Sequence, residues 1–169
     1  MADSATASGE VAGVGIRLAG EADLPRVSRL WSALAADEQA LGVPIRANER
    51  ALESWLGSFA RHLGRFTFLW VAEHEGVVKA FLLARLKTRP VYLGGELIGE
   101  LCSIYVDPDL RGLRTGALLV RTAIRGLQDA GANAIEVDAH EANAAACKFW
   151  EAQGFRVGFR TYRWRPPPQ

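Results

Sequence analysis

The chain has 169 residues, of which 49% are hydrophobic and 23% are charged, a composition typical of a soluble globular protein with one domain. Its formal net charge of +1 provides no overall field to attract nucleic acid or a membrane surface, so we expect neither as a partner. The two cysteines, Cys102 and Cys147, lie in apolar segments, which favours buried thiols in the reducing cytoplasm over a disulfide or a zinc site.

Both ends of the chain differ in composition from the rest. Residues 1–14 are small and polar and lack the basic and apolar regions of a secretory signal, so they predict a disordered N-terminal tail. Residues 166–169 predict a second tail at the C-terminus, because consecutive prolines cannot extend a strand. Residues 15–165 then predict a single domain, without internal repeats and without an apolar run of the roughly 18 residues that a membrane-spanning helix needs.

Hydrophobic periodicity predicts six strands and four helices in chain order. Segments rich in aromatic and β-branched residues predict strands at 16–18, 66–73, 77–86, 96–106, 134–139 and 156–164. Apolar residues at intervals of three and four predict helices at 24–36, 48–63, 115–130 and 142–153. Hairpins impose antiparallel pairs and strand–helix–strand units impose parallel ones. The expected fold class is therefore α/β (α+β), a mixed and mostly antiparallel twisted sheet with helices on both faces.

The segment DPDLRGLRTGALLV, residues 107–120, leads from a strand through a loop rich in glycine and arginine into a helix. The amides at the start of a helix have no helical acceptor, and the helix dipole adds positive potential there. Arg111 and Arg114 can add charge-assisted hydrogen bonds, so the loop predicts a site for a phosphate-bearing ligand. The alternative is an ordinary turn with solvated arginines. Neither a P-loop motif nor a Rossmann fingerprint is present.

Two motifs in this chain resemble those of the GNAT superfamily of acyl-CoA-dependent N-acetyltransferases. The family pattern R/Q-x-x-G-x-G/A, after a strand ending V-x-P, is similar to VDPDLRGLRTGA at 106–117. The pattern N-x-x-A-x-x-F-Y, followed by x-x-x-G-F, is similar to NAAACKFW at 143–150 with EAQGF at 151–155. The resemblance extends over about residues 16–164.

The resemblance implies a three-layer fold in which two central strands splay apart and acetyl-CoA (coenzyme A) binds as co-substrate, with no metal. It implies acetyl transfer from the thioester to a primary amine by direct transfer. The residues that would bind the cofactor are Ile104, Tyr105, Val106, Arg111, Gly112, Leu113, Arg114, Thr115, Gly116, Ala117, Asn143, Ala146, Phe149 and Trp150.

The chain departs from the family pattern at two positions. Arg114 replaces the middle glycine of the loop, and a non-glycine residue with positive φ costs roughly 1–2 kcal/mol, which phosphate binding by the arginine would offset. Trp150 stands where the family often has the tyrosine that protonates the departing thiolate, and indole has no accessible acid function. We expect Trp150 to pack in the core.

Glu100 is the candidate catalytic residue, as a base or as the anchor of a water relay, because the family often carries a carboxylate on this strand. The alternative is an exposed carboxylate at a sheet edge, or one paired with an arginine. Strict alternation would place Ser103 and Tyr105 on the opposite face of the sheet from Glu100. Cys102 shares the Glu100 face, but it has no evident base partner for nucleophilic catalysis. His140 fits a capping or surface role better than a proton carrier.

The acceptor amine is only weakly constrained by the sequence. Asp37 and Glu38, in the predicted break at 37–47, could attract a cationic amine, so a small-molecule amine and a peptide or protein N-terminus both stay open, as does a homodimer. Two other functions also stay open. One is a non-catalytic acyl-CoA-binding module of the same fold, and the other is an unrelated α/β domain that binds another phosphate ligand.

Overall fold

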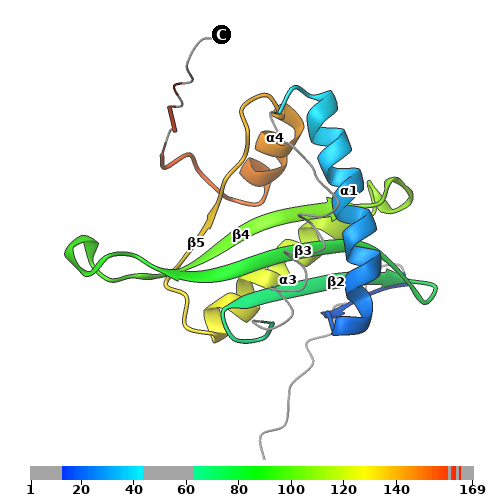
Figure 1. Ribbon diagram of the computed structural model, residues 1–169, viewed down its shortest axis with the longest axis horizontal. Coiled ribbons are helices and arrows are strands. Elements are labelled where there is room, and N and C mark those ends of the chain that lie inside the picture. The colour runs from blue at the N-terminus through cyan, green and yellow to red at the C-terminus, as the bar shows by residue number, and fades with distance from the viewer. Residues whose placement is uncertain (1–12, 44–62, 160, 163, 165–169) are drawn as a thin grey trace, which may run out of the picture.

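A computed structural model of the chain describes residues 13–43, 63–159, 161, 162 and 164. Its strands are β1 (Val14–Leu18), β2 (Thr67–His74), β3 (Val77–Thr88), β4 (Leu97–Val106) and β5 (Ala134–Val137). Its helices are α1 (Leu24–Ala40), α3 (Thr115–Asp129) and α4 (Ala144–Ala152), with short 3-10 turns at Glu21–Asp23, Val91–Leu93 and Pro108–Leu110 (Figure 1). The predicted helix at 48–63 lies outside the described residues, apart from its last position.

The five strands form one sheet in the order β1-β2-β3-β4-β5. The first three pairings are antiparallel, and β4 pairs with β5 in parallel, as the connection through α3 requires. This is the mixed, mostly antiparallel sheet that the sequence predicts. At the β2–β3 turn, Glu75 and Gly76 both have positive φ, which matches the right-handed twist of the flanking strands.

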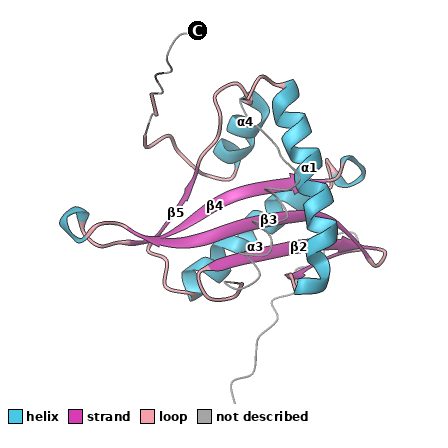
Figure 2. Ribbon diagram, in the orientation of Figure 1, coloured by secondary structure: helices cyan, strands magenta, loops and turns pink. Residues whose placement is uncertain are grey.

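Helices cover both faces of the sheet (Figure 2). Alternate residues of β2 explain this arrangement, because Leu69 and Val71 pack in the core beneath α1, whereas Trp70 and Ala72 pack in the core beneath α3. Burial on both faces accounts for the uninterrupted apolar run in the middle of this strand. Trp150 brings α4 into the core on the α3 side.

The packing of α3 depends on a close approach between Gly126 and Trp70. A Cβ atom added at Gly126 would lie 2.7 Å from the Cζ2 atom of Trp70. Only a residue without a side chain allows the helix to sit this close to β2.

Three sequence predictions need correction. Val14, placed in the N-terminal tail, belongs to β1 and is buried. The break expected from residue 37 begins later, because α1 continues to Ala40, so Asp37 and Glu38 lie in its last turn. The strand expected at 156–164 does not form among the described residues of that segment, which have no regular structure.

Candidate active site

The site begins where β4 and β5 separate. β5 pairs only with Ile98–Leu101, and β4 then continues to Val106 without it. The Asp107 amide donates to the Lys79 carbonyl (2.9 Å), so the pair of Val106 with Ala80 is a non-hydrogen-bonded one. The backbone polar groups of Val106, and by alternation those of Ile104, therefore point toward the side that β5 has left. The splayed strand pair that the resemblance implies is present.

The start of α3 lies next to this opening and carries backbone donors without internal acceptors. The first helical hydrogen bond runs from the Leu118 amide to the Arg114 carbonyl (3.0 Å). Within the described part of the chain, no residue accepts from the amides of Arg114 to Ala117. The amide of Leu113, by contrast, makes a long bond to Leu110 (3.4 Å). Several amides and the positive end of the helix thus converge on one point, which is the arrangement that binds phosphate.

The two arginines of the loop behave differently. Arg111 is used within the protein: its Nε donates to the Val106 carbonyl (3.0 Å), its Nη2 contacts Asp37 of α1 (2.9 Å), and its guanidinium lies over the Tyr105 ring. Arg114 has φ of 61° and ψ of 11°, the left-handed conformation that a glycine would adopt more easily. Its side chain has no hydrogen-bond or ionic partner among the described residues.

The second motif forms the wall beside the loop. Asn143 is the N-cap of α4, where its Oδ1 accepts from the Ala146 amide (3.0 Å). A Cβ added at Gly116 would lie 3.3 Å from the Phe149 ring, so the two helices meet closely here. Trp150 is buried and packs edge to face with Phe149 and Phe155, which matches the packing role expected of it.

A β-bulge in β4 changes which side chains share a face. Leu83 is opposite Ser103, but the next residue of β3, Ala84, is opposite Leu101, so Cys102 is the extra residue. The bulge places Ser103 and Tyr105 on the same face as Glu100. The expectation of opposite faces was wrong, because alternation holds only in a regular strand.

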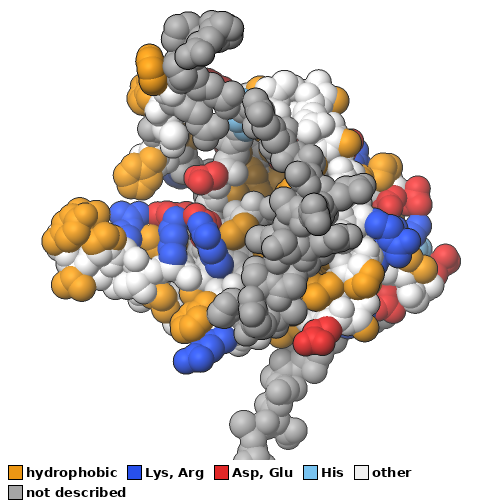
Figure 3. All heavy atoms as spheres, in the orientation of Figure 1, with side chains coloured by type: hydrophobic (Ala, Val, Ile, Leu, Met, Phe, Trp, Pro, Cys, Tyr) orange, Lys and Arg blue, Asp and Glu red, His pale blue; other side chains and the backbone are white. Residues whose placement is uncertain are grey.

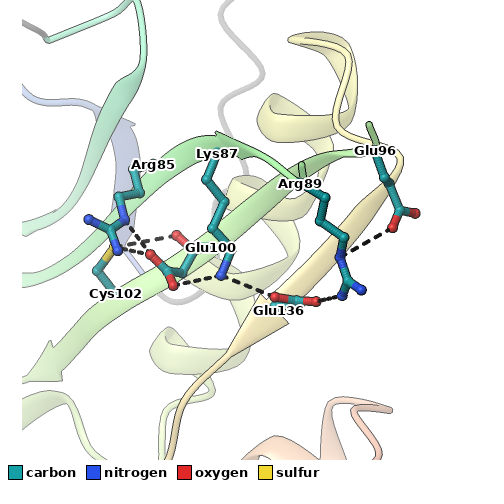
Figure 4. A network of polar contacts seen from close by, with 7 residues as sticks. All are labelled: Arg85, Lys87, Arg89, Glu96, Glu100, Cys102 and Glu136. Atoms are coloured by element: carbon teal, nitrogen blue, oxygen red, sulfur yellow. Dashed lines mark hydrogen bonds and ion pairs between the residues drawn. The ribbon is translucent and has the colours of Figure 1, made fainter. Parts of the chain in front are cut away.

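Glu100 lies in a network of ion pairs on this face (Figure 4). Its Oε1 accepts from Lys87 (2.9 Å) and its Oε2 accepts from Arg85, while Glu136 of β5 binds both Lys87 (3.1 Å) and Arg89. Arg85 and Lys87 are more exposed than the Glu100 carboxylate that they bind. Figure 3 shows blue Lys and Arg side chains next to red carboxylates on one face of the molecule. Burial alone would raise the pKa of Glu100, but the hydrogen bonds from Lys87 and Arg85 outweigh it and hold the pKa below its ordinary value.

The thiol of Cys102 is not activated. Cys102 is exposed and Cys147 is only partly buried, so the expectation of two buried thiols was wrong. Desolvation by neighbouring groups, followed by the negative charge of Glu100, still raises the pKa of Cys102 to about 11. Among the described residues, the hydrogen-bond contacts of the thiol are with the carbonyl and carboxylate oxygens of Glu100, at 3.5 and 3.8 Å. A thiol that stays protonated at neutral pH is a poor nucleophile, which supports the sequence-based argument against an acyl-cysteine intermediate.

Glu38 is a carboxylate whose environment the sequence does not reveal. It follows Asp37, which contacts Arg111 at the end of β4, and it interacts electrostatically with His140 in the loop after β5. Glu38 therefore lies near the ends of both diverging strands. Burial raises its pKa and outweighs the opposing effect of His140. His140 caps its own loop, because its Nδ1 accepts from the Ala142 amide (3.1 Å).

Two general features bear on the class of site. No group of three or more His, Cys, Asp or Glu side chains in the described ranges is arranged to hold a metal ion. None of the helices in those ranges combines the length and hydrophobicity that crossing a bilayer requires.

Curated proteins and solved structures similar to this chain agree with the geometry. A mycothiol acetyltransferase from Thermobispora bispora is 27% identical over 86% of this chain, and one from Thermomonospora curvata is 30% identical over 59%. The aligned regions cover 64% and 32% of those relatives, so this chain spans less than two thirds of the length of either.

Solved structures share the fold over nearly the whole chain. A variant of protein BH1408 from Bacillus halodurans superposes with a TM-score of 0.77 at 23% identity, covering 90% of this chain and 99% of its own. The aminoglycoside N-acetyltransferase AAC(6')-Iy, in complex with CoA, superposes with a TM-score of 0.75 at 18% identity, covering 96% of this chain and 98% of its own. A family model described as "Acetyltransferase (GNAT) family" matches residues 30–155, and the chain belongs to that family.

Proposed function

We propose that this protein is an acetyl-CoA-dependent N-acetyltransferase that moves the acetyl group directly to a primary amine. The observation that carries the proposal is the position of the unpaired amides of Arg114–Ala117 beside the opening between β4 and β5. The start of α3 supplies an anion site, and the part of β4 that β5 has left supplies an unpaired strand edge. A long ligand with a diphosphate and an amide-containing arm fits both together.

The residues present fit such a co-substrate. The amides of Arg114–Ala117 and the guanidinium of Arg114 would hold the diphosphate, and Gly116 lets the start of α3 lie close against the Phe149 ring. The backbone groups of Ile104 and Val106 would bind the amide arm, as an added strand binds a sheet edge. Arg111 would support the site by fixing α1 to the end of β4, since its side chain is already engaged. When bound, acetyl-CoA would supply an activated thioester.

The chain's own groups then have three tasks. The Val106 amide points toward the opening and can donate to oxygen as negative charge develops there. The amine must lose a proton, and Glu38, with its raised pKa, suits that step better than Glu100. Glu100 has both oxygens occupied by cations, so we assign it the anchoring role in a water relay.

The proposal is tested by measuring thiol release from acetyl-CoA across a panel of amines. Because the similar proteins are named for mycothiol and aminoglycosides, the panel includes acceptors of those two kinds together with peptide N-termini. We expect turnover with at least one amine and a loss of turnover in Glu38→Gln and Glu100→Gln. Glu96→Gln is the matched control, since the Glu96 carboxylate makes a long contact with Arg89 (3.7 Å).

Two results would contradict this function. Binding of acetyl-CoA without thiol release on any acceptor would favour a non-catalytic acyl-CoA-binding module. Equal competition by coenzyme A and by simple adenine nucleotides would favour a different phosphate ligand.

A further inference from the structure

The face of the sheet that α1 covers continues beyond the core as a row of charged side chains. In β3, Leu83 is buried beneath α1, and alternation places Arg85 and Lys87 on the same face, past the buried part. Arg85 is opposite Glu100 of β4, which is in turn opposite Glu136 of β5. Cations and carboxylates therefore alternate across three strands, and Arg85 stands at one end of the resulting network (Figure 4).

Arg85 differs from the other two cations of this network because it has unused donors. The Lys87 ammonium binds both Glu100 (2.9 Å) and Glu136 (3.1 Å). The Arg89 guanidinium binds Glu136 and also lies over an aromatic ring. Arg85 binds Glu100 through its Nε, and its two terminal nitrogens have no hydrogen-bond partner among the described residues. Its side chain is also the most exposed of the three, at 59%.

The free donors of Arg85 lie beside the candidate active site. β5 stays paired with β4 as far as Val137, which is opposite Leu101, and Asp138 is the first residue beyond that pair. The Arg85 guanidinium interacts electrostatically with Asp138 and with the Cys102 thiol at the bulge. Arg85 is therefore close to the point where β4 and β5 begin to separate.

A guanidinium with two free terminal nitrogens suits a carboxylate or a phosphate, because its planar fork can donate two parallel hydrogen bonds. The nearby acids do not fill this role: Glu100 is bound through Nε, and Asp138 forms no ion pair with Arg85 in the described structure. We propose that Arg85 binds an anionic group, a carboxylate or a phosphate, that the acceptor amine carries. This role of Arg85 rests on the proposed function, since the acceptor is the one that the same site would use.

Matched acceptors test this role by binding as well as by turnover. The probes are linear ω-amino carboxylates and ω-aminoalkyl phosphates of increasing chain length, each compared with the amino amide or amino alcohol of the same length, which lacks the anion. With coenzyme A present, we expect calorimetry to give at least one anionic amine a Kd about tenfold lower than that of its neutral counterpart. The comparison of carboxylates with phosphates shows which anion is preferred. In turnover with acetyl-CoA, the same preference should appear in KM rather than in kcat.

Three variants connect the preference with Arg85. Arg85→Gln should bind anionic and neutral acceptors equally, whereas Arg85→Lys, which keeps the charge but not the fork, should retain part of the preference. Arg125→Gln removes an exposed arginine of α3, on the other face of the sheet, and should leave the preference unchanged. Because Arg85 also binds Glu100, its variants should lower kcat, but this loss cancels when two acceptors are compared in the same variant.

Two results would overturn this role of Arg85. Equal affinity of the wild-type protein for anionic and neutral acceptors, including no measurable binding of either, would show that no anion is recognised. A preference that survives Arg85→Gln would assign the anion to another residue. If no acceptor causes thiol release, the proposed function fails, and the comparison of Kd values still decides whether Arg85 binds the anion.

Discussion

Arg111 and Arg114 lie three residues apart in one loop, yet their different surroundings give them different roles. Arg111 joins α1 to the end of β4 through Asp37 and the Val106 carbonyl. Arg114 keeps an unpartnered guanidinium on a left-handed backbone, within the described structure. Backbone strain that persists next to unused hydrogen-bond donors is characteristic of ligand-binding sites.

Replacing Arg114 separates its backbone strain from its ligand binding. In Arg114→Gly the left-handed conformation no longer costs roughly 1–2 kcal/mol, although the more flexible unfolded chain offsets part of this gain. We expect the free energy of unfolding to rise by about 0.5–1 kcal/mol in urea titrations, while acetyl-CoA binds more weakly by calorimetry. Tighter binding of acetyl-CoA by the variant would show that the arginine hinders the site.

Glu100 should stabilise the fold in a pH-dependent manner. Its folded pKa is depressed, so its contribution is fully present above the unfolded value near ~4.3 and is lost as the pH falls through the folded pKa. We expect Glu100→Gln to lower the free energy of unfolding by about 1 kcal/mol at pH 7, because the ion pairs are partly exposed. Urea titrations from pH 7 to pH 3 should show the difference from wild type shrinking at the acidic end. A difference that stays constant with pH would show that the ion pairs do not stabilise the fold.

At the level of secondary-structure elements, hydrophobic periodicity predicted helices and strands correctly wherever a segment packs against elements close to it in the chain. It located all five observed strands and the three observed helices to within a few residues of their ends. It failed for residues 156–164, because the described residues of this segment have no regular structure although their composition is β-prone. It also missed the bulge at Cys102 and the contact of Arg111 with Asp37, 74 residues away, because both depend on how separate elements meet.

The contact of α3 with β2 is the element-scale feature most sensitive to a small change. Gly126→Ala would gain about 1 kcal/mol of helix propensity but would place Cβ within 2.7 Å of Trp70. Overpacking in a filled core typically costs about 1–3 kcal/mol, so we expect net destabilisation.

A double-mutant cycle checks this explanation. In a Trp70→Phe background the clashing ring atom is absent, so Gly126→Ala should be neutral or stabilising there, as measured by thermal unfolding. The same cost in both backgrounds would mean that the clash with Trp70 is not the cause.

For the whole molecule, the divergence of β4 from β5 and the start of α3 form one composite site. Acetyl-CoA that binds only the folded protein at about 100 times its dissociation constant should stabilise it by about 2.7 kcal/mol, which corresponds to roughly 5–10 °C in Tm for a domain of this size. Gly116→Val should remain folded but lose this shift, because a Cβ there would already lie 3.3 Å from the Phe149 ring and the added methyl groups would push the start of α3 out of place. An undiminished shift in the variant would place the cofactor elsewhere.

Amide NMR of the labelled protein can show whether the amides of Arg114–Ala117 hold the diphosphate of coenzyme A. Titration with coenzyme A should shift these four amide resonances strongly, and pantetheine, which lacks the diphosphate, should move the resonances of Ile104 and Val106 but leave those four nearly unchanged. If coenzyme A binds without any change in the resonances of Arg114–Ala117, these amides do not hold the diphosphate.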